Sequence, residues 1–84
     1  MEYSKHFNKM LEEREILTKW VEQAIAAPDK IENRKDGTCH YIKQIPEYEN
    51  RWLRVVINAN VAPNRAITAF FDRRLRRKES WELE

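Results

Sequence analysis

The sequence predicts an α+β fold, in which two N-terminal helices are followed by a four-stranded antiparallel sheet. Apolar residues recur with helical spacing as far as Pro28, and from Asp29 onward the period changes to two. An Asp36-Gly37 pair between two such runs marks a hairpin. A chain of 84 residues suits one small domain, which we expect to span residues 1–84.

Two amphipathic helices account for the first third of the chain. Ser4 suits the N-cap of a helix that runs to about Arg14, because its hydroxyl can accept a backbone hydrogen bond from the first turn. A second helix is expected from about Thr18, and Pro28 ends it. The apolar residues expected to pack on the sheet are Phe7, Met10, Leu11, Trp20, Val21, Ala24 and Ile25.

Four strands are expected over residues 30–34, 38–45, 52–59 and 66–72. The first has the weak pattern of an edge strand, whereas the last two are β-branched and aromatic and are expected to be central. Asp36-Gly37 predicts a two-residue turn between the first two strands, because both residues accept positive φ.

Alternation along the last two strands separates a core face from a second face. The residues expected to pack on the helices are Leu53, Val55, Ile57, Ile67, Ala69 and Phe71. The opposite face then displays Trp52, Arg54, Thr68 and Phe70, an aromatic and polar surface.

Charge is distributed unevenly along the chain. Residues 1–50 carry eight Lys and Arg against ten Asp and Glu, whereas residues 51–84 carry eight against four. A basic tail begins at about Arg73, and five of the six residues from Arg73 to Lys78 are cationic. This asymmetry favours an RNA or an acidic protein as partner, although a solvated surface explains it equally well.

The composition excludes several classes of site. Cys39 is the single cysteine, so an intrachain disulfide and a cysteine-based zinc cluster are excluded, and a reducing cytoplasm is the expected location. No segment is long and apolar enough for a bilayer span, so no membrane partner is expected. One glycine cannot build a glycine-rich phosphate loop, and no metal or other cofactor is expected.

Several short motifs occur in a recognisable order: Ser4–Phe7, Met10–Ile16, the helix that ends at Pro28, Leu53–Ile57 and Ala66–Phe70. In this order and spacing the chain resembles the bacterial family called domain of unknown function 4258, which is related to the BrnT and RelE toxin-like folds. The family usually has glycine where Glu15 stands here. Because a non-glycine residue is costly in a left-handed helix cap, the first helix is expected to continue or to end differently.

The resemblance implies a toxin that cleaves RNA without a metal and is neutralised by an antitoxin protein. Such cleavage needs a group that accepts the 2′-hydroxyl proton and cations that stabilise the phosphate. The candidate catalytic residues are His6, His40 and Arg54. The candidate nucleic-acid-binding residues are Arg14, Trp52, Arg54, Phe70, Arg73 and Arg74.

Each candidate also has a structural interpretation. His6 and Arg14 are suited to bracing the first helix against the sheet, and Arg54 to a cross-strand ion pair with Glu47 or Glu49. Asp72 is suited to pairing with Arg73 or Arg74. The Trp52 and Phe70 face also fits a homodimer or antitoxin interface, which we favour for these two aromatics over base stacking. A non-enzymatic interaction module is therefore the alternative to a ribonuclease.

Overall fold

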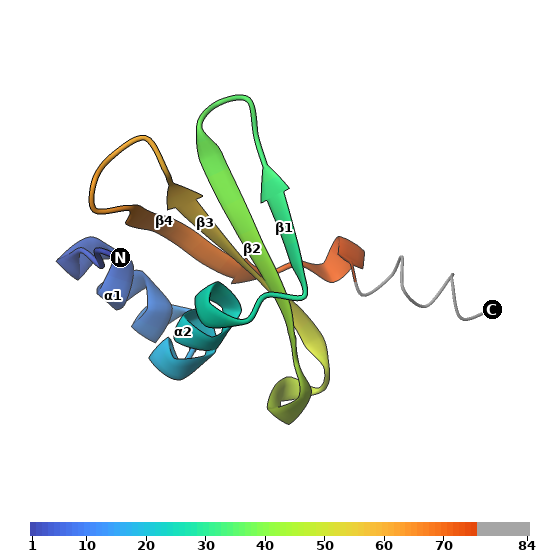
Figure 1. Cartoon of the computed structure of the whole chain (residues 1–84). Helices are drawn as coiled ribbons and strands as arrows, with labels where there is room; N and C mark the ends of the chain where they lie inside the picture. Colours follow the sequence, from blue (N-terminus) through green and yellow to red (C-terminus); the bar gives the residue numbers. More distant parts are fainter. Residues whose placement is uncertain (76–84) are drawn as a thin grey trace.

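The computed structural model describes residues 1–75, so Arg76, Arg77 and Lys78 of the basic tail lie outside the described part. Two helices precede a four-stranded antiparallel sheet (Figure 1), which confirms the predicted α+β fold. The elements are α1 (Lys5–Glu13), α2 (Thr18–Ala26), β1 (Lys30–Asn33), β2 (Thr38–Ile45), a 3-10 turn (Pro46–Tyr48), β3 (Arg51–Asn58) and β4 (Arg65–Phe71). No helix within residues 1–75 is long and apolar enough to cross a membrane.

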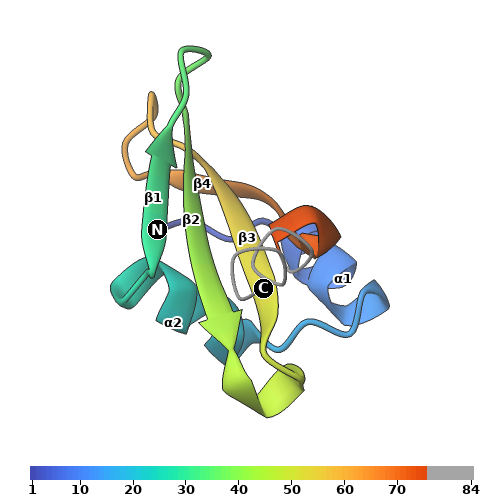
Figure 2. The ribbon, with the colours of Figure 1, turned by 90° about the vertical axis from the view of Figure 1, so that its right-hand side faces the viewer.

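The strands form a meander in the order β1-β2-β3-β4, and both helices cover the same face (Figures 1 and 2). The expectation that β4 lies centrally was wrong, because β4 is an edge strand. Its edge is nevertheless occupied. The backbone of Glu2 bridges Arg65, and Arg14 Nη1 donates to the carbonyl of Ala69 at 2.8 Å. These contacts explain how an apolar strand can stand at an edge without inviting association.

Helix α1 begins and ends with capping motifs. The Ser4 hydroxyl accepts a hydrogen bond from the Phe7 backbone N–H at 3.0 Å, as predicted. At the other end Glu15 has a φ of 56°, and the Ile16 N–H donates to the Leu11 carbonyl at 2.8 Å. This is a Schellman motif, in which Ile16 also packs with Leu11 in the core. The expectation that the helix would continue or end differently was therefore wrong, because it ends as it would with glycine, with Glu15 in the left-handed region.

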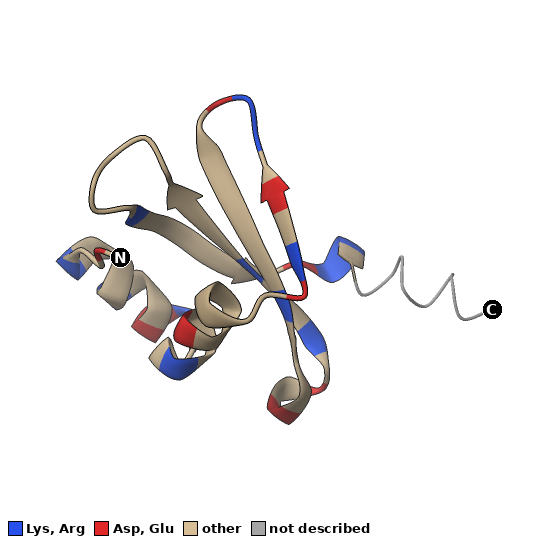
Figure 3. Cartoon of the chain, viewed as in Figure 1, with Lys and Arg blue, Asp and Glu red and all other residues tan. Residues whose placement is uncertain are grey.

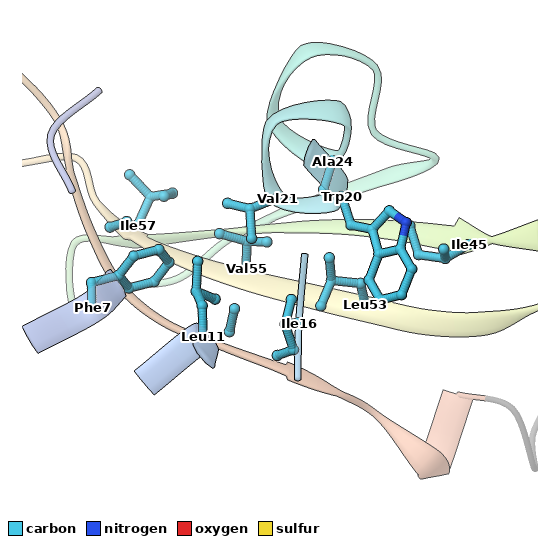
Figure 4. Close-up of a cluster of buried hydrophobic side chains, with 12 residues drawn as sticks. Phe7, Leu11, Ile16, Trp20, Val21, Ala24, Ile45, Leu53, Val55 and Ile57 are labelled. Carbon is cyan, nitrogen blue, oxygen red and sulfur yellow. The ribbon is translucent and has the colours of Figure 1, made fainter. Parts of the chain in front are cut away.

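The core lies between the helices and one face of the sheet (Figure 4). The strand β3 side chains predicted to face it, Leu53, Val55 and Ile57, are fully buried. The expectation for Ile67 was wrong, because its side chain is 44% exposed and Ala66 is buried instead. Val56 pairs with Thr68 whereas Ile57 pairs with Ala66, so a bulge leaves Ile67 out of the register.

The first hairpin has a longer turn than the predicted two-residue turn. Its loop is closed by a hydrogen bond from the Arg34 N–H to the Thr38 carbonyl, and Gly37 in this loop has a φ of 88°. The Gly37 N–H donates to the Arg34 carbonyl, which is the arrangement of a type I turn followed by a glycine bulge. The register that results places Glu32 opposite His40.

Replacing Glu15 by glycine is expected to stabilise the protein by about 1 kcal/mol, because glycine adopts the left-handed region without a Cβ penalty. In a domain of this size, that corresponds to a rise of roughly 4–8 °C in melting temperature. Thermal unfolding measures it. Lys9→Gly, in the exposed interior of α1, should instead destabilise by about 1 kcal/mol. Glu15→Gln separates the loss of charge from the backbone effect. If Glu15→Gly melts no higher than Glu15→Gln, backbone strain at residue 15 does not limit stability.

Candidate functional site

The candidate site lies on the face of the sheet opposite the helices, which we call the helix-free face. Alternation along β3 directs Trp52, Arg54 and Val56 to this side, since Leu53, Val55 and Ile57 enter the core. Cross-strand partners share a face, and the register aligns Arg54 with Ile42 and Phe70. It also aligns Val56 with His40, which in turn pairs with Glu32. Side chains from all four strands therefore meet here.

The centre of the site is the guanidinium group of Arg54, a residue only 5% exposed. Its Nε donates to Asp72 Oδ2 at 3.0 Å, directly after β4. Its Nη1 donates to Glu32 Oε1 at 2.9 Å on β1 and lies 3.0 Å from His40 Nδ1 on β2. The predicted ion pair of Arg54 with Glu47 or Glu49 was wrong, because Arg54 pairs with Glu32 and Asp72 and the partner of Glu49 is Arg51. We call Arg54, Asp72, Glu32 and His40 the Arg54 cluster.

The contact with Arg54 determines the tautomer of His40. A guanidinium nitrogen can only donate, so Nδ1 accepts and the neutral ring carries its proton on Nε2. Nε2 lies 3.3 Å from Thr38 Oγ1, whose hydroxyl donates to Asp36 Oδ1 at 2.6 Å. Burial, together with the positive charges of Arg34 and Arg54, lowers the pKa of His40 below its ordinary value of 6.5. His40 is therefore neutral near pH 7.

Both carboxylates of the cluster are held in the ionised form. The hydrogen bond from Arg54 lowers the pKa of Glu32 from 4.5 to about 2, with further help from Lys30 and Arg34. Burial raises the pKa of Asp72, but hydrogen bonds from Arg74 and Arg54 outweigh burial, and the net direction is downward. Arg74 Nε lies 3.2 Å from Asp72 Oδ1, which is the predicted neighbour pair.

Exposed cations surround the cluster. Lys30 Nζ lies 3.3 Å and Arg34 Nη2 lies 2.6 Å from Glu32, and these side chains are 56% and 49% exposed. Arg74 is 84% exposed beside Asp72. The cationic segments of β1, β3 and the short helical segment that begins after Asp72 are visible in Figure 3. Around the Arg54 cluster, four cations face three carboxylates, Glu32, Asp72 and Asp36, so a surplus of one positive charge remains.

The structure brings some of the predicted residues together and separates others. His40 and Arg54 are in contact. His6 is exposed on α1, in the other layer, so the two imidazoles do not converge. Arg14 Nη1 donates to Thr68 Oγ1 at 3.2 Å and to the Ala69 carbonyl, so it anchors α1 to β4 as its structural interpretation suggested.

The remaining predicted residues lie on or beside the helix-free face. Trp52 and Phe70 are half-buried on it, and Arg73 and Arg74 are exposed in the short helical segment that begins after Asp72. Glu32 was missed by the sequence analysis. A four-residue edge strand gives little signal, and only the register of the first hairpin shows that Glu32 faces Arg54. Within residues 1–75, no group of three or more His, Cys, Asp or Glu side chains is placed to hold a metal ion.

A protein-family model described as "Domain of unknown function (DUF4258)" matches residues 3–71. The chain belongs to this family. The match takes in α1, α2 and β1 to β4 of this DUF4258 protein and three residues of the Arg54 cluster, and it ends just before Asp72. No curated protein and no solved structure matches the chain at a significant level.

The Arg54 cluster makes the stability of this DUF4258 protein depend on pH. Glu32 has a pKa of about 2 in the fold against 4.5 ordinarily, so its contribution is complete above pH 4.5 and is lost as the pH falls toward 2. Glu32→Gln should therefore show a shallower loss of unfolding free energy across this window, measured by urea unfolding at stepwise pH. Glu47→Gln, at an exposed position of the 3-10 turn, should keep the wild-type slope. If the unfolding free energies of the wild type and Glu32→Gln fell in parallel across this pH range, the lowered pKa of Glu32 would be contradicted.

Proposed function

We propose that the helix-free face binds RNA and that His40 takes part in cleaving it, as in toxins of the RelE and BrnT type. The observation that carries the proposal is the neutral imidazole of His40, hydrogen-bonded to a buried arginine on a face with surplus positive charge. A neutral imidazole is the state that a general base requires, and a neighbouring guanidinium suits the charge that develops on a phosphate.

The surrounding residues support binding of a single strand. Lys30, Arg34 and Arg74 provide exposed charges at the edge of the cluster, which suit phosphates. Trp52 and Phe70 lie on the same face and are half-buried. Cations beside aromatic rings are the combination found where proteins bind single-stranded nucleic acids.

In the proposed cleavage step, His40 acts as the general base. Once Nδ1 is released from Arg54, its lone pair can accept the proton of a 2′-hydroxyl. The 2′ oxygen then forms a bond to phosphorus, and the bond to the 5′ oxygen breaks. That oxygen takes a proton from water, and the hydroxide left behind takes the proton that His40 accepted, which restores the neutral base. The products are a 2′,3′-cyclic phosphate and a 5′-hydroxyl end. Arg54 remains in place through Asp72, at 3.0 Å, to stabilise the additional negative charge.

A protein-interaction role is the second candidate. Ile31 on the edge strand β1 is 49% exposed, and an exposed strand edge can pair with another chain. An antitoxin, or a second copy of the chain, would use this edge together with the Trp52 and Phe70 face. RNA binding by the isolated protein distinguishes the two roles. Binding favours the RNA-directed role, because a protein-interaction module does not need to bind RNA.

RNA binding is expected to depend on the cations of the helix-free face. Arg34→Ala and Arg74→Ala should weaken binding of an unstructured single-stranded RNA. Each should lower the slope of log affinity against log salt by about 0.7 for every phosphate that the variant no longer neutralises. Fluorescence anisotropy across a salt series measures both. Lys9→Ala and Lys19→Ala remove exposed charges from the helices and should keep the wild-type slope. Equal weakening in all four variants would count against a specific face.

Cleavage is expected to require His40 and to proceed in the presence of a metal chelator. His40→Ala should lower the rate by about 10²–10⁴-fold, the usual contribution of a general base, while RNA affinity changes little. Gel analysis of end-labelled RNA, with detection of 2′,3′-cyclic phosphate ends, measures the reaction. His6→Ala, at an exposed position in the other layer, is the matched control and should cleave normally. RNA that is bound but left intact by the wild-type protein would restrict the function to binding.

A further inference from the structure

Glu32 lies where several cations converge on one anion. Its Oε1 accepts from Arg34 Nη2 at 2.6 Å and from Arg54 Nη1 at 2.9 Å, and its Oε2 lies 3.3 Å from Lys30 Nζ. These cations come from β1, the following turn and β3, so they approach the carboxylate from different elements. A phosphate group offers oxygens to the same kind of donors, and arginine in particular binds two of them at once.

The two carboxylates that bind Arg54 differ in their accessibility. The Asp72 side chain is 3% exposed and also accepts from the backbone N–H of Arg74 at 3.0 Å, so it is fixed in place. The Glu32 side chain is 23% exposed and projects from a four-residue edge strand. Glu32 can therefore leave the cluster while Arg54 keeps an ion-pair partner, because Asp72 continues to neutralise the guanidinium.

We propose that Lys30, Arg34 and Arg54 form a phosphate-binding site that the Glu32 carboxylate occupies in the free protein. A phosphate of the RNA backbone displaces Glu32 and takes its place on Arg54 Nη1. Since His40 Nδ1 lies 3.0 Å from the same nitrogen, the bound phosphate is the one next to the imidazole. The inference rests on the proposed function for its RNA ligand, whereas the anion site itself rests on the contacts alone.

Inorganic phosphate tests the site independently of RNA. Glu32→Gln removes the competing charge and should bind phosphate roughly tenfold or more tightly than the wild type, measured by isothermal titration calorimetry. Glu49→Gln is the matched control, because it removes the same charge from a carboxylate paired with one cation, Arg51, at 3.2 Å. Adding Arg34→Ala to Glu32→Gln should cancel the gain. Equal affinity of Glu32→Gln and Glu49→Gln for phosphate would overturn the proposal.

A second variant covers the case in which Glu32→Gln fails to fold. Glu32→Asp keeps the charge but shortens the side chain by one methylene, so it should hold the cations less well and bind phosphate more tightly than the wild type. Unchanged affinity in this variant would also overturn the site. Binding of single-stranded RNA by the same variants is measured separately, because it tests the proposed function. Tighter phosphate binding together with no RNA binding would uphold the anion site and refute the proposed function. If Glu32→Gln binds both phosphate and single-stranded RNA more tightly than the wild type, the anion site and the proposed function are both supported.

Discussion

The buried guanidinium of Arg54 is the constraint on which the arrangement of the sheet depends. Removing a charge from water costs several kcal/mol, and this cost is offset only where the partners are close and well oriented. Arg54 meets Asp72 at 3.0 Å, Glu32 at 2.9 Å and His40 at 3.0 Å. These partners come from β1, β2 and the residue after β4. The apolar helix face holds the layers together, whereas the Arg54 cluster requires that the strands adopt this one register.

Much of the fold could be predicted from periodicity. The helix stripes, the Ser4 cap and the alternation along β3 are local patterns, and the structure confirms them. The errors occurred where the backbone departs from regular alternation. A bulge at Ile67 moves Ala66 into the core, and a strand pattern contains no mark of the extra residue. β4 stands at the edge because it is the last strand of the meander, and the contacts from Arg14 and Glu2 that cover this edge are reported by no local pattern.

The residues of the candidate site were also predicted only in part. His40 and Arg54 could be chosen from residue type and strand face, because imidazole and guanidinium groups are few and chemically distinctive. Glu32 could not be chosen, because a difference of one residue in the length of the first hairpin turn decides which face of the sheet its side chain occupies. A two-residue turn at Asp36-Gly37 would pair Glu32 with Tyr41 and direct its carboxylate toward the helices. The longer turn pairs it with His40 instead, and this single step completes the cluster.

The composition of the Arg54 cluster also bears on the order of folding. Its members stand at positions 32, 40, 54 and 72, so closing it requires contacts between residues far apart along the chain. The helices and each hairpin can form from local contacts, but the cluster closes only when all four strands are aligned. If the cluster closes last, we expect it to slow unfolding of the sheet more than it speeds folding.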